Sequence, residues 1–143
     1  MRILMVTSKR YLPQFYGGAE VSIHSMCHVL KQMGHEVAVL AELMPGNALA
    51  WQNRLKHLLG GRRKNFPADH ALGYPVFRGW KPTDAVSEVK ARWKPDVVFA
   101  QSGRVIAMAE AFEAQQLPVC VFLRHAHYDH LGGLPRTAKS PSC

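Results

Sequence analysis

The sequence predicts an α/β fold built as one domain around a doubly wound, mainly parallel sheet. Short, almost continuously apolar runs alternate along the chain with segments whose apolar residues recur every three or four positions, as strands and helices would. The short runs are apolar throughout, which is typical of strands buried on both faces. With 143 residues, of which 48% are hydrophobic and 20% charged, the chain is long enough to bury a core and too short for two full domains.

The first forty residues predict a strand, a loop, a helix and a second strand. The first strand is Ile3–Thr7, and the loop after it contains Pro13 and the pair Gly17-Gly18. Gly34 is placed to end the helix, and Glu36–Leu40 is the second strand. One face of the helix carries the apolar residues Ile23, Met26, Cys27, Leu30 and Met33. The crossover of this unit is expected to be right-handed.

The rest of the chain continues the alternation. Residues 47–59, 83–93 and 102–116 predict helices, the second of them opened by Thr83 as its N-cap. Residues 74–77, 96–100 and 119–123 predict strands. Together the elements predict a Rossmann-like domain over residues 1–133, followed by an irregular tail over residues 134–143. Ligands of such a sheet are expected at the carboxyl ends of its strands.

The formal net charge is +8, from 18 Lys and Arg against 10 Asp and Glu. This charge favours acidic partners such as phosphorylated substrates, anionic lipid or nucleic acid. Nucleic acid is not expected, because no helix-turn-helix, zinc-finger or RNA-binding aromatic pattern is present. The three cysteines are widely spaced, and the first residues do not have the pattern of a signal peptide. We therefore expect a cytoplasmic protein, with peripheral contact to the inner face of a membrane as an alternative.

The pair Gly17-Gly18 lies between the first strand and the first helix. Two glycines there allow backbone N–H groups to approach a ligand, and the N-terminus of the helix favours a negative charge. The spacing is neither that of G-x-G-x-x-G nor that of a P-loop. The alternative is a turn whose glycines only let the helix pack closely against the strand.

Several blocks of the sequence together resemble the N-terminal domain of family-4-type glycosyltransferases of the GT-B fold. These blocks are Pro13, Gly17-Gly18-Ala19-Glu20, Leu30-x-x-x-Gly34-His35-Glu36-Val37, Pro95-Asp96-Val97-Val98 and the strand at 119–123. The resemblance covers residues 1–133. It implies transfer of a sugar from a nucleotide-diphosphate sugar to an acceptor, in a cleft between two Rossmann-like domains. It also implies that the glycine loop, here Gly17 and Gly18 with Glu20 in the first helical turn, lies against the donor diphosphate.

The resemblance further implies a polar residue, often His, that follows the strand at 119–123 and faces the transferred sugar. Arg124 or His125 occupies this place, Arg124 being suited to phosphate or hydroxyl contacts and His125 to a hydrogen bond with the sugar. The alternative is that both only solvate the end of the strand. The family's second domain, which supplies the nucleotide pocket, has no counterpart in these residues. We therefore expect turnover only with a C-terminal nucleotide-sugar domain or a partner chain.

A second motif follows the last predicted strand. His125, His127, Asp129 and His130, followed by Gly132-Gly133, are similar to the HxHxDH signature of the metallo-β-lactamase superfamily. Such residues can hold Zn²⁺ and activate water, which makes a Zn-dependent hydrolase an alternative. The residues after His130 contain no His, Asp or Glu, and the chain before the motif is not β-rich. The sequence therefore favours a chance match, and no cofactor is predicted.

A basic amphipathic segment lies in the middle of the chain. Its candidate contacts with an anionic membrane surface are Trp51, Arg54, Lys56, Arg62, Arg63 and Lys64. The alternative is ordinary packing of its leucines with a solvated basic face. A third possibility for the whole chain is a truncated, non-catalytic half-domain that only binds nucleotide, acceptor or membrane.

Overall fold

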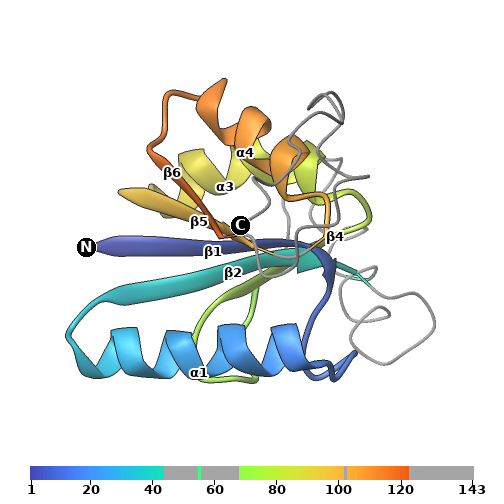
Figure 1. Cartoon of the computed structure of the whole chain (residues 1–143), viewed down its shortest axis with the longest axis vertical. Coiled ribbons are helices and arrows are strands. Elements are labelled where there is room, and N and C mark those ends of the chain that lie inside the picture. Colours follow the sequence, from blue (N-terminus) through green and yellow to red (C-terminus); the bar gives the residue numbers. More distant parts are fainter. Residues whose placement is uncertain (44–54, 56–67, 102, 123–143) are drawn as a thin grey trace, which may run out of the picture.

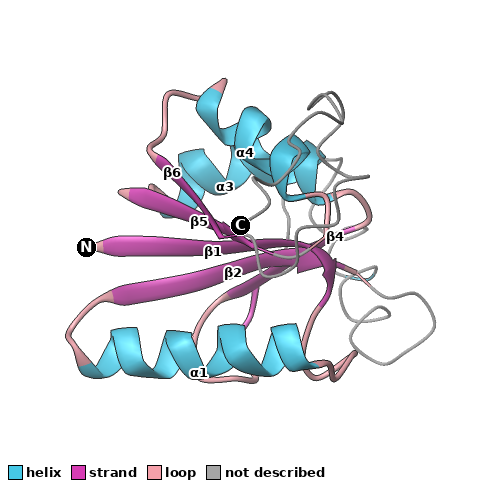
Figure 2. Ribbon diagram, viewed as in Figure 1, coloured by secondary structure: helices cyan, strands magenta, loops and turns pink. Residues whose placement is uncertain are grey.

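The computed structural model describes residues 1–43, 55, 68–101 and 103–122. They form a six-stranded sheet with α1 (Gly18–Gln32) on one face and α3 (Val86–Trp93) and α4 (Val105–Glu113) on the other (Figures 1 and 2). This is the layered α/β architecture that the alternating sequence pattern predicts.

Five strands of the sheet are parallel. They are β1 (Arg2–Arg10), β2 (Glu36–Glu42), β4 (Val76–Gly79), β5 (Val97–Gln101) and β6 (Val119–Phe122). The spatial order is β3-β4-β2-β1-β5-β6, so the chain winds from β1 to one side and then returns to build the other. This order confirms the doubly wound sheet. The edge strand β3 (Ala68–Asp69) is antiparallel to β4 and was not predicted, since two residues carry no periodicity.

The first predicted helix is confirmed as α1, and the last as α4, which is shorter at both ends than the predicted 102–116; the helix predicted over 83–93 begins later, as α3. Gly34, at φ +89°, follows the end of α1 in the left-handed conformation expected of a C-terminal glycine. Thr83 does not cap a helix, so that prediction is wrong. It lies inside the 3₁₀ turn η1 (Pro82–Ala85), and α3 begins after Ala85 without a side-chain cap. The fixed φ of Pro82 suits the first position of a helical turn, which moves the start ahead of Thr83.

The core has two halves, one on each face of the sheet. Alternate residues of β1 contribute to both halves: Leu4 and Val6 pack under α3 and α4, and Met5 packs under α1. From the helices, Met108 and Phe112 fill the first half, and Ile23 and Cys27 fill the second. Burial of each large apolar side chain contributes about 1.5–3 kcal/mol to stability. The central strand is therefore held from both sides.

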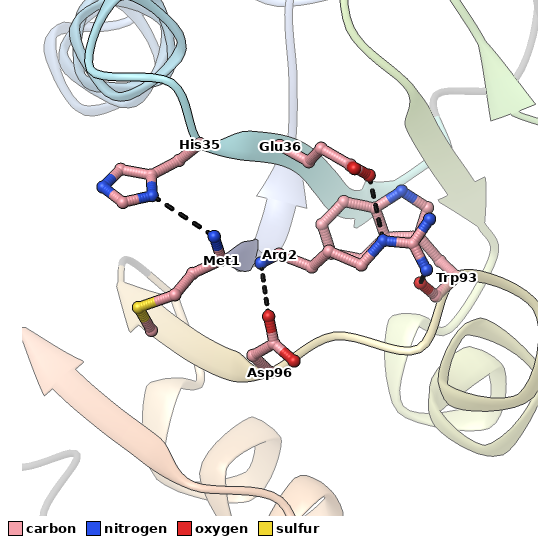
Figure 3. Close-up of polar contacts among 6 residues, drawn as sticks. All are labelled: Met1, Arg2, His35, Glu36, Trp93 and Asp96. Carbon is pink, nitrogen blue, oxygen red and sulfur yellow. Dashed lines mark hydrogen bonds and ion pairs between the residues drawn. The ribbon is translucent and has the colours of Figure 1, made fainter.

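The amino ends of the strands are joined by polar contacts (Figure 3). The Arg2 side chain donates to Glu36 Oε2 and to the Trp93 carbonyl, both at 2.9 Å, and its backbone N–H donates to Asp96 Oδ2 at 2.6 Å. The Met1 amino group lies 3.5 Å from Nδ1 of His35. His35, Glu36 and Asp96 belong to the sequence blocks that carry the resemblance. Their observed contacts therefore fasten β1 to its neighbours at the edge opposite the carboxyl ends.

Two predictions lie partly or wholly outside the described residues. Of the segment 47–59 only Leu55 is described, and it is helical and half-exposed. The boundary at residue 133 and the tail at 134–143 also fall outside, so these domain limits stay predictions. Within the part of the chain that the structure describes, no helix has the length and apolar character needed to cross a membrane.

Candidate functional site

The candidate site lies at the edge of the sheet where the parallel strands end. In Figure 1 this is the right-hand edge, and α1 also begins there. The winding direction of the chain changes between β1 and β5, so the ends of these two strands flank the crevice in which open α/β sheets bind ligands. The site is therefore built from the loops after β1 and β5 and from the first turn of α1.

Gly17 and Gly18 have different surroundings at the start of α1. Gly17 is the N-cap residue in extended conformation, and a Cβ there would overlap Oε2 of Glu20. The same Cβ would lie 3.0 Å from Cε1 of Phe15. A Cβ on Gly18 would meet nothing within 4 Å among the described residues. Close packing accounts for the glycine at position 17, whereas the first turn is open to approach at position 18.

Glu20 is buried in the first turn of α1. Only 2% of the residue is exposed, and its Oε1 has no hydrogen-bond partner in the described part of the chain. A carboxylate at this position is stabilised by the N-terminus of the helix. It also offsets part of the helix's attraction for an external anion, so a bound diphosphate would need cations close by.

Arg78 holds the loop that leads to the glycines. This residue, at the end of β4, is fully buried, and its Nε donates to Asp69 Oδ2 at 2.6 Å. Its Nη1 donates to the Tyr11 carbonyl at 3.2 Å, and its Nη2 donates to the Leu12 carbonyl. A buried charge needs partners, and here the partners are the backbone of the site loop and a carboxylate from β3. The loop after β1 is thus held by hydrogen bonds to β4, which in turn is paired with β3.

Tyr11 is the first residue of this loop and is fully buried. Its hydroxyl lies 2.8 Å from the hydroxyl of Tyr74. Burial, reinforced by this hydrogen bond, raises the pKa of Tyr11 well above its usual range. The phenol therefore stays protonated and acts as a structural hydrogen-bonding group at the base of the loop.

The end of β1 contacts the loop after β5 at the switch point. The Arg104 backbone N–H donates to Ser8 Oγ at 2.5 Å. Gly103 has φ +70°, and a Cβ there would overlap the same Ser8 oxygen. Gln101 is 1% exposed, and both polar atoms of its side chain lack partners among the described residues. The side chain of Arg104 is exposed beside them.

A shallow pocket of about 220 Å³ lies next to the glycine loop, lined by Lys9, Arg10, Phe15 and Glu42. Two cations and one carboxylate give it a net positive lining, and Phe15 supplies an apolar face. Such a lining can accept an anionic group beside a flat or apolar one.

Sequence reasoning found the glycine loop but missed the residues that build its surroundings. Gly17, Gly18 and Glu20 lie together at the start of α1. The missed residues are Ser8, Tyr11, Arg78, Gln101, Gly103 and Arg104. A signal was available for some of them, since Ser8, Arg78 and Gln101 are polar residues at the ends of apolar runs.

The remaining predicted site residues lie outside the described residues. These are Arg124 and His125, the alternative zinc ligands His127, Asp129 and His130, and the membrane-surface candidates Trp51, Arg54, Lys56, Arg62, Arg63 and Lys64. Within the described ranges, no three His, Cys, Asp or Glu side chains gather in a way that could hold a metal ion. The zinc alternative at 125–130 is thus not tested.

One protein family matches the chain. The model of the family described as Glycosyltransferase Family 4 matches residues 16–141 of the chain. No curated protein matches the chain. The matched region begins beside Gly17 and contains α1 and every later element of the sheet.

Proposed function

Because the chain belongs to glycosyltransferase family 4, we propose that it forms the acceptor-side half of an enzyme that transfers a sugar from a nucleotide-diphosphate sugar to an acceptor. A function of the glycosyltransferase type follows from the family. The positions of donor and acceptor and the need for a second half are the proposal. The family match does not favour the zinc-hydrolase alternative.

The donor diphosphate lies, in this proposal, against the glycine loop: Gly18 and the first turn of α1 face it, and Gly17 is the packed residue just before them. The observation that supports this is that a Cβ on Gly18 would meet nothing within 4 Å among the described residues, beside the edge of the sheet where such folds bind ligands. The first backbone N–H groups of a helix have no partner within it and point toward an approaching anion. A glycine at this position leaves them uncovered.

Cations at the end of β1 and at the start of α4 compensate for the negative charge of the buried Glu20. Lys9 and Arg10 line the pocket beside the glycine loop, and Arg104 is exposed at the start of α4. Charge that develops on the departing diphosphate would be stabilised by these groups and by the helix N-terminus. The acceptor would lie over the pocket formed by Lys9, Arg10 and Phe15.

The transferred sugar would lie near Arg124 and His125, which follow β6 in the sequence. β6 pairs with β5, so the chain leaves the sheet at the same edge as the loop of Gly103 and Arg104. Arg124 would contact phosphate or hydroxyl oxygens, and His125 would donate a hydrogen bond to the sugar. We propose no cofactor and no turnover without a nucleotide-sugar domain or partner chain.

The cellular setting is also a proposal. We infer a cytoplasmic protein, with contact between its basic segment around Trp51, Arg54, Lys56 and Arg62–Lys64 and an anionic membrane surface as the alternative setting. The charge of +8 supports attraction to such a surface.

The donor site can be tested by titrating the ¹⁵N-labelled chain with UDP-glucose and GDP-mannose at millimolar concentration. The amide signals of Gly17 to Glu20 should shift, and Gly18→Val should weaken binding by about tenfold or more, as loss of one good contact would. The matched control is Gln32→Val, which places the same β-branched residue at the exposed far end of α1. Unchanged amide signals in the parent, or equal affinity in Gly18→Val, would contradict donor binding at Gly18. The glycine pair would then have only a structural role in the turn before α1.

A further inference from the structure

Two histidines face each other on α1, away from its first turn. His24 and His28 are one helical turn apart, and their Nε2 atoms are 3.2 Å apart. The rings are nearly perpendicular, with centroids 4.4 Å apart. His28 is exposed, so the pair is open to solvent on one side.

The inner histidine is oriented by a buried hydrogen-bond chain. Nδ1 of His24 lies 2.6 Å from the hydroxyl of Tyr74, which lies 2.8 Å from the hydroxyl of Tyr11. Burial raises the pKa of Tyr74 well above its usual range, so the phenol keeps its proton. When that proton points to Tyr11, the phenol oxygen accepts the Nδ1–H of His24. Nε2 of His24 is then unprotonated, and its lone pair accepts the hydrogen bond from Nε2–H of His28.

This is the arrangement found around histidines that bind metals, in which one ring nitrogen ligates and the other donates to an oxygen. Desolvation, and then the neighbouring His28, lower the pKa of His24, so its neutral form is favoured. In the free protein the two Nε2 atoms share one proton. If that proton moves to Nδ1 of His28, both Nε2 lone pairs become available without net release of a proton.

The distance between the two nitrogens also fits a metal. Two nitrogens at about 2.05 Å from a tetrahedral zinc ion stand about 3.4 Å apart. The observed separation of 3.2 Å needs almost no movement to reach that value. The i, i+4 spacing of two histidines on one helical face is also the spacing that zinc enzymes with paired helical histidines use.

We propose that His24 and His28 form a two-histidine site for a divalent cation of the Zn²⁺, Ni²⁺ and Cu²⁺ class, with water completing the coordination. Imidazole is a preferred ligand of these ions. The nearest basic residue along the helix, Lys31, is engaged with the Gly73 carbonyl at 2.6 Å. This site is separate from the glycine loop and does not depend on the proposed sugar transfer.

The bound ion would lie at the outer end of a hydrogen-bond chain that joins α1 to the base of the site loop. His24 contacts Tyr74, Tyr74 contacts Tyr11, and the Tyr11 carbonyl is held by Arg78. An ion that binds only the folded chain raises its apparent stability, so Zn²⁺ should raise Tm in a concentration-dependent way.

The test uses the full chain with His125, His127 and His130 replaced by Ala, so that the histidine-rich segment cannot contribute. Calorimetric titration with Zn²⁺ should then give one site per chain. Removing an outer hydrogen-bond partner of a ligand costs about 10–100-fold in affinity, so Tyr74→Phe should weaken binding by about tenfold and His28→Gln by more.

A matched control distinguishes binding by the histidine pair from binding that depends only on the number of histidines. The double variant His28→Gln/Val29→His keeps the number of imidazoles but moves one of them off the shared face, at an exposed position. It should bind as weakly as His28→Gln, whereas His35→Gln should bind like the parent. EPR spectra of the Cu²⁺-loaded parent should show coupling to two imidazole nitrogens, and those of His28→Gln to one.

Three results would overturn the site. They are the absence of saturable Zn²⁺ binding in the parent, unchanged affinity in His28→Gln, and unchanged affinity in the double variant. Circular dichroism of each metal-free variant establishes that it is folded. If His28→Gln does not fold, His24→Gln is used in its place to disrupt the histidine pair.

Discussion

At the start of α1, the two adjacent glycines Gly17 and Gly18 have different surroundings, and these explain each glycine differently. Gly17 is a glycine because the Glu20 carboxylate occupies the place that a side chain would take. Gly18 has no such neighbour among the described residues, and neither of the two has a positive φ. The distinction matters for function, because only the second glycine leaves surface open for a ligand.

We expect opposite effects of alanine at these two positions. Gly17→Ala should destabilise the chain by about 1–2 kcal/mol, since a methyl group forced against a packed side chain produces strain. Gly18→Ala should be stabilising by up to about 1 kcal/mol, because alanine restricts the unfolded chain and favours the helix. Urea denaturation measures both. In Gly17→Ala/Glu20→Ala the penalty at position 17 should largely disappear, and equal effects of the two single changes would contradict this account.

Among the elements, β4 determines where the site loop lies. Its last residues carry Arg78 into the interior, where the guanidinium meets Asp69 of β3 and the carbonyls of Tyr11 and Leu12. The short edge strand β3 and its neighbour β4 thereby fix the loop that follows the central strand β1. The ion pair is buried on the arginine side and 11% exposed on the aspartate side, so solvent screens it little.

Removing this cation should loosen the loop. Arg78→Met is expected to cost about 3–5 kcal/mol, because it leaves a buried carboxylate and two carbonyls without a donor. Arg78→Met/Asp69→Asn should recover part of that loss, since the uncompensated charge is gone. Urea denaturation measures the loss, and amide signals of residues 11–18 report the loop. A loss below about 1 kcal/mol, the range of an exposed pair, would show that the guanidinium does not hold the loop.

At the scale of the whole molecule, burial among the described residues differs between the centre and the flank of the sheet. β1 pairs with β2 on one side and β5 on the other, and Leu4, Met5 and Val6 are almost fully buried. β6 is paired on one side only among the described residues, and three of its four residues are exposed. The sheet thus combines a buried centre with a less protected flank.

Hydrogen exchange should follow this gradient. The amides of Leu4 to Val6 should exchange only by global unfolding, and those of Val119 to Phe122 should exchange faster through local opening. Mass spectrometry of peptic fragments measures both. Equal protection of β1 and β6 would mean that β6 is covered by something beyond the described residues.

The type and order of most elements were determined by the sequence, because apolar periodicity and glycines that end helices or form turns act over a few neighbouring residues. The glycine after α1, the alternation of strands with helices and the position of Gly17-Gly18 ahead of a helix are all of this kind. The short strand β3 and the turn η1 were not, since they depend on packing and on a single proline.

The tertiary structure alone decided which residues meet. Ser8 and Arg104 are 96 positions apart, Leu12 and Arg78 are 66 apart, and His24 and Tyr74 are 50 apart. No local pattern encodes such pairs, because they arise only when β4 and β5 take their places on opposite sides of β1. The sequence determined that a glycine loop precedes α1, and the packing of the sheet determined what surrounds it.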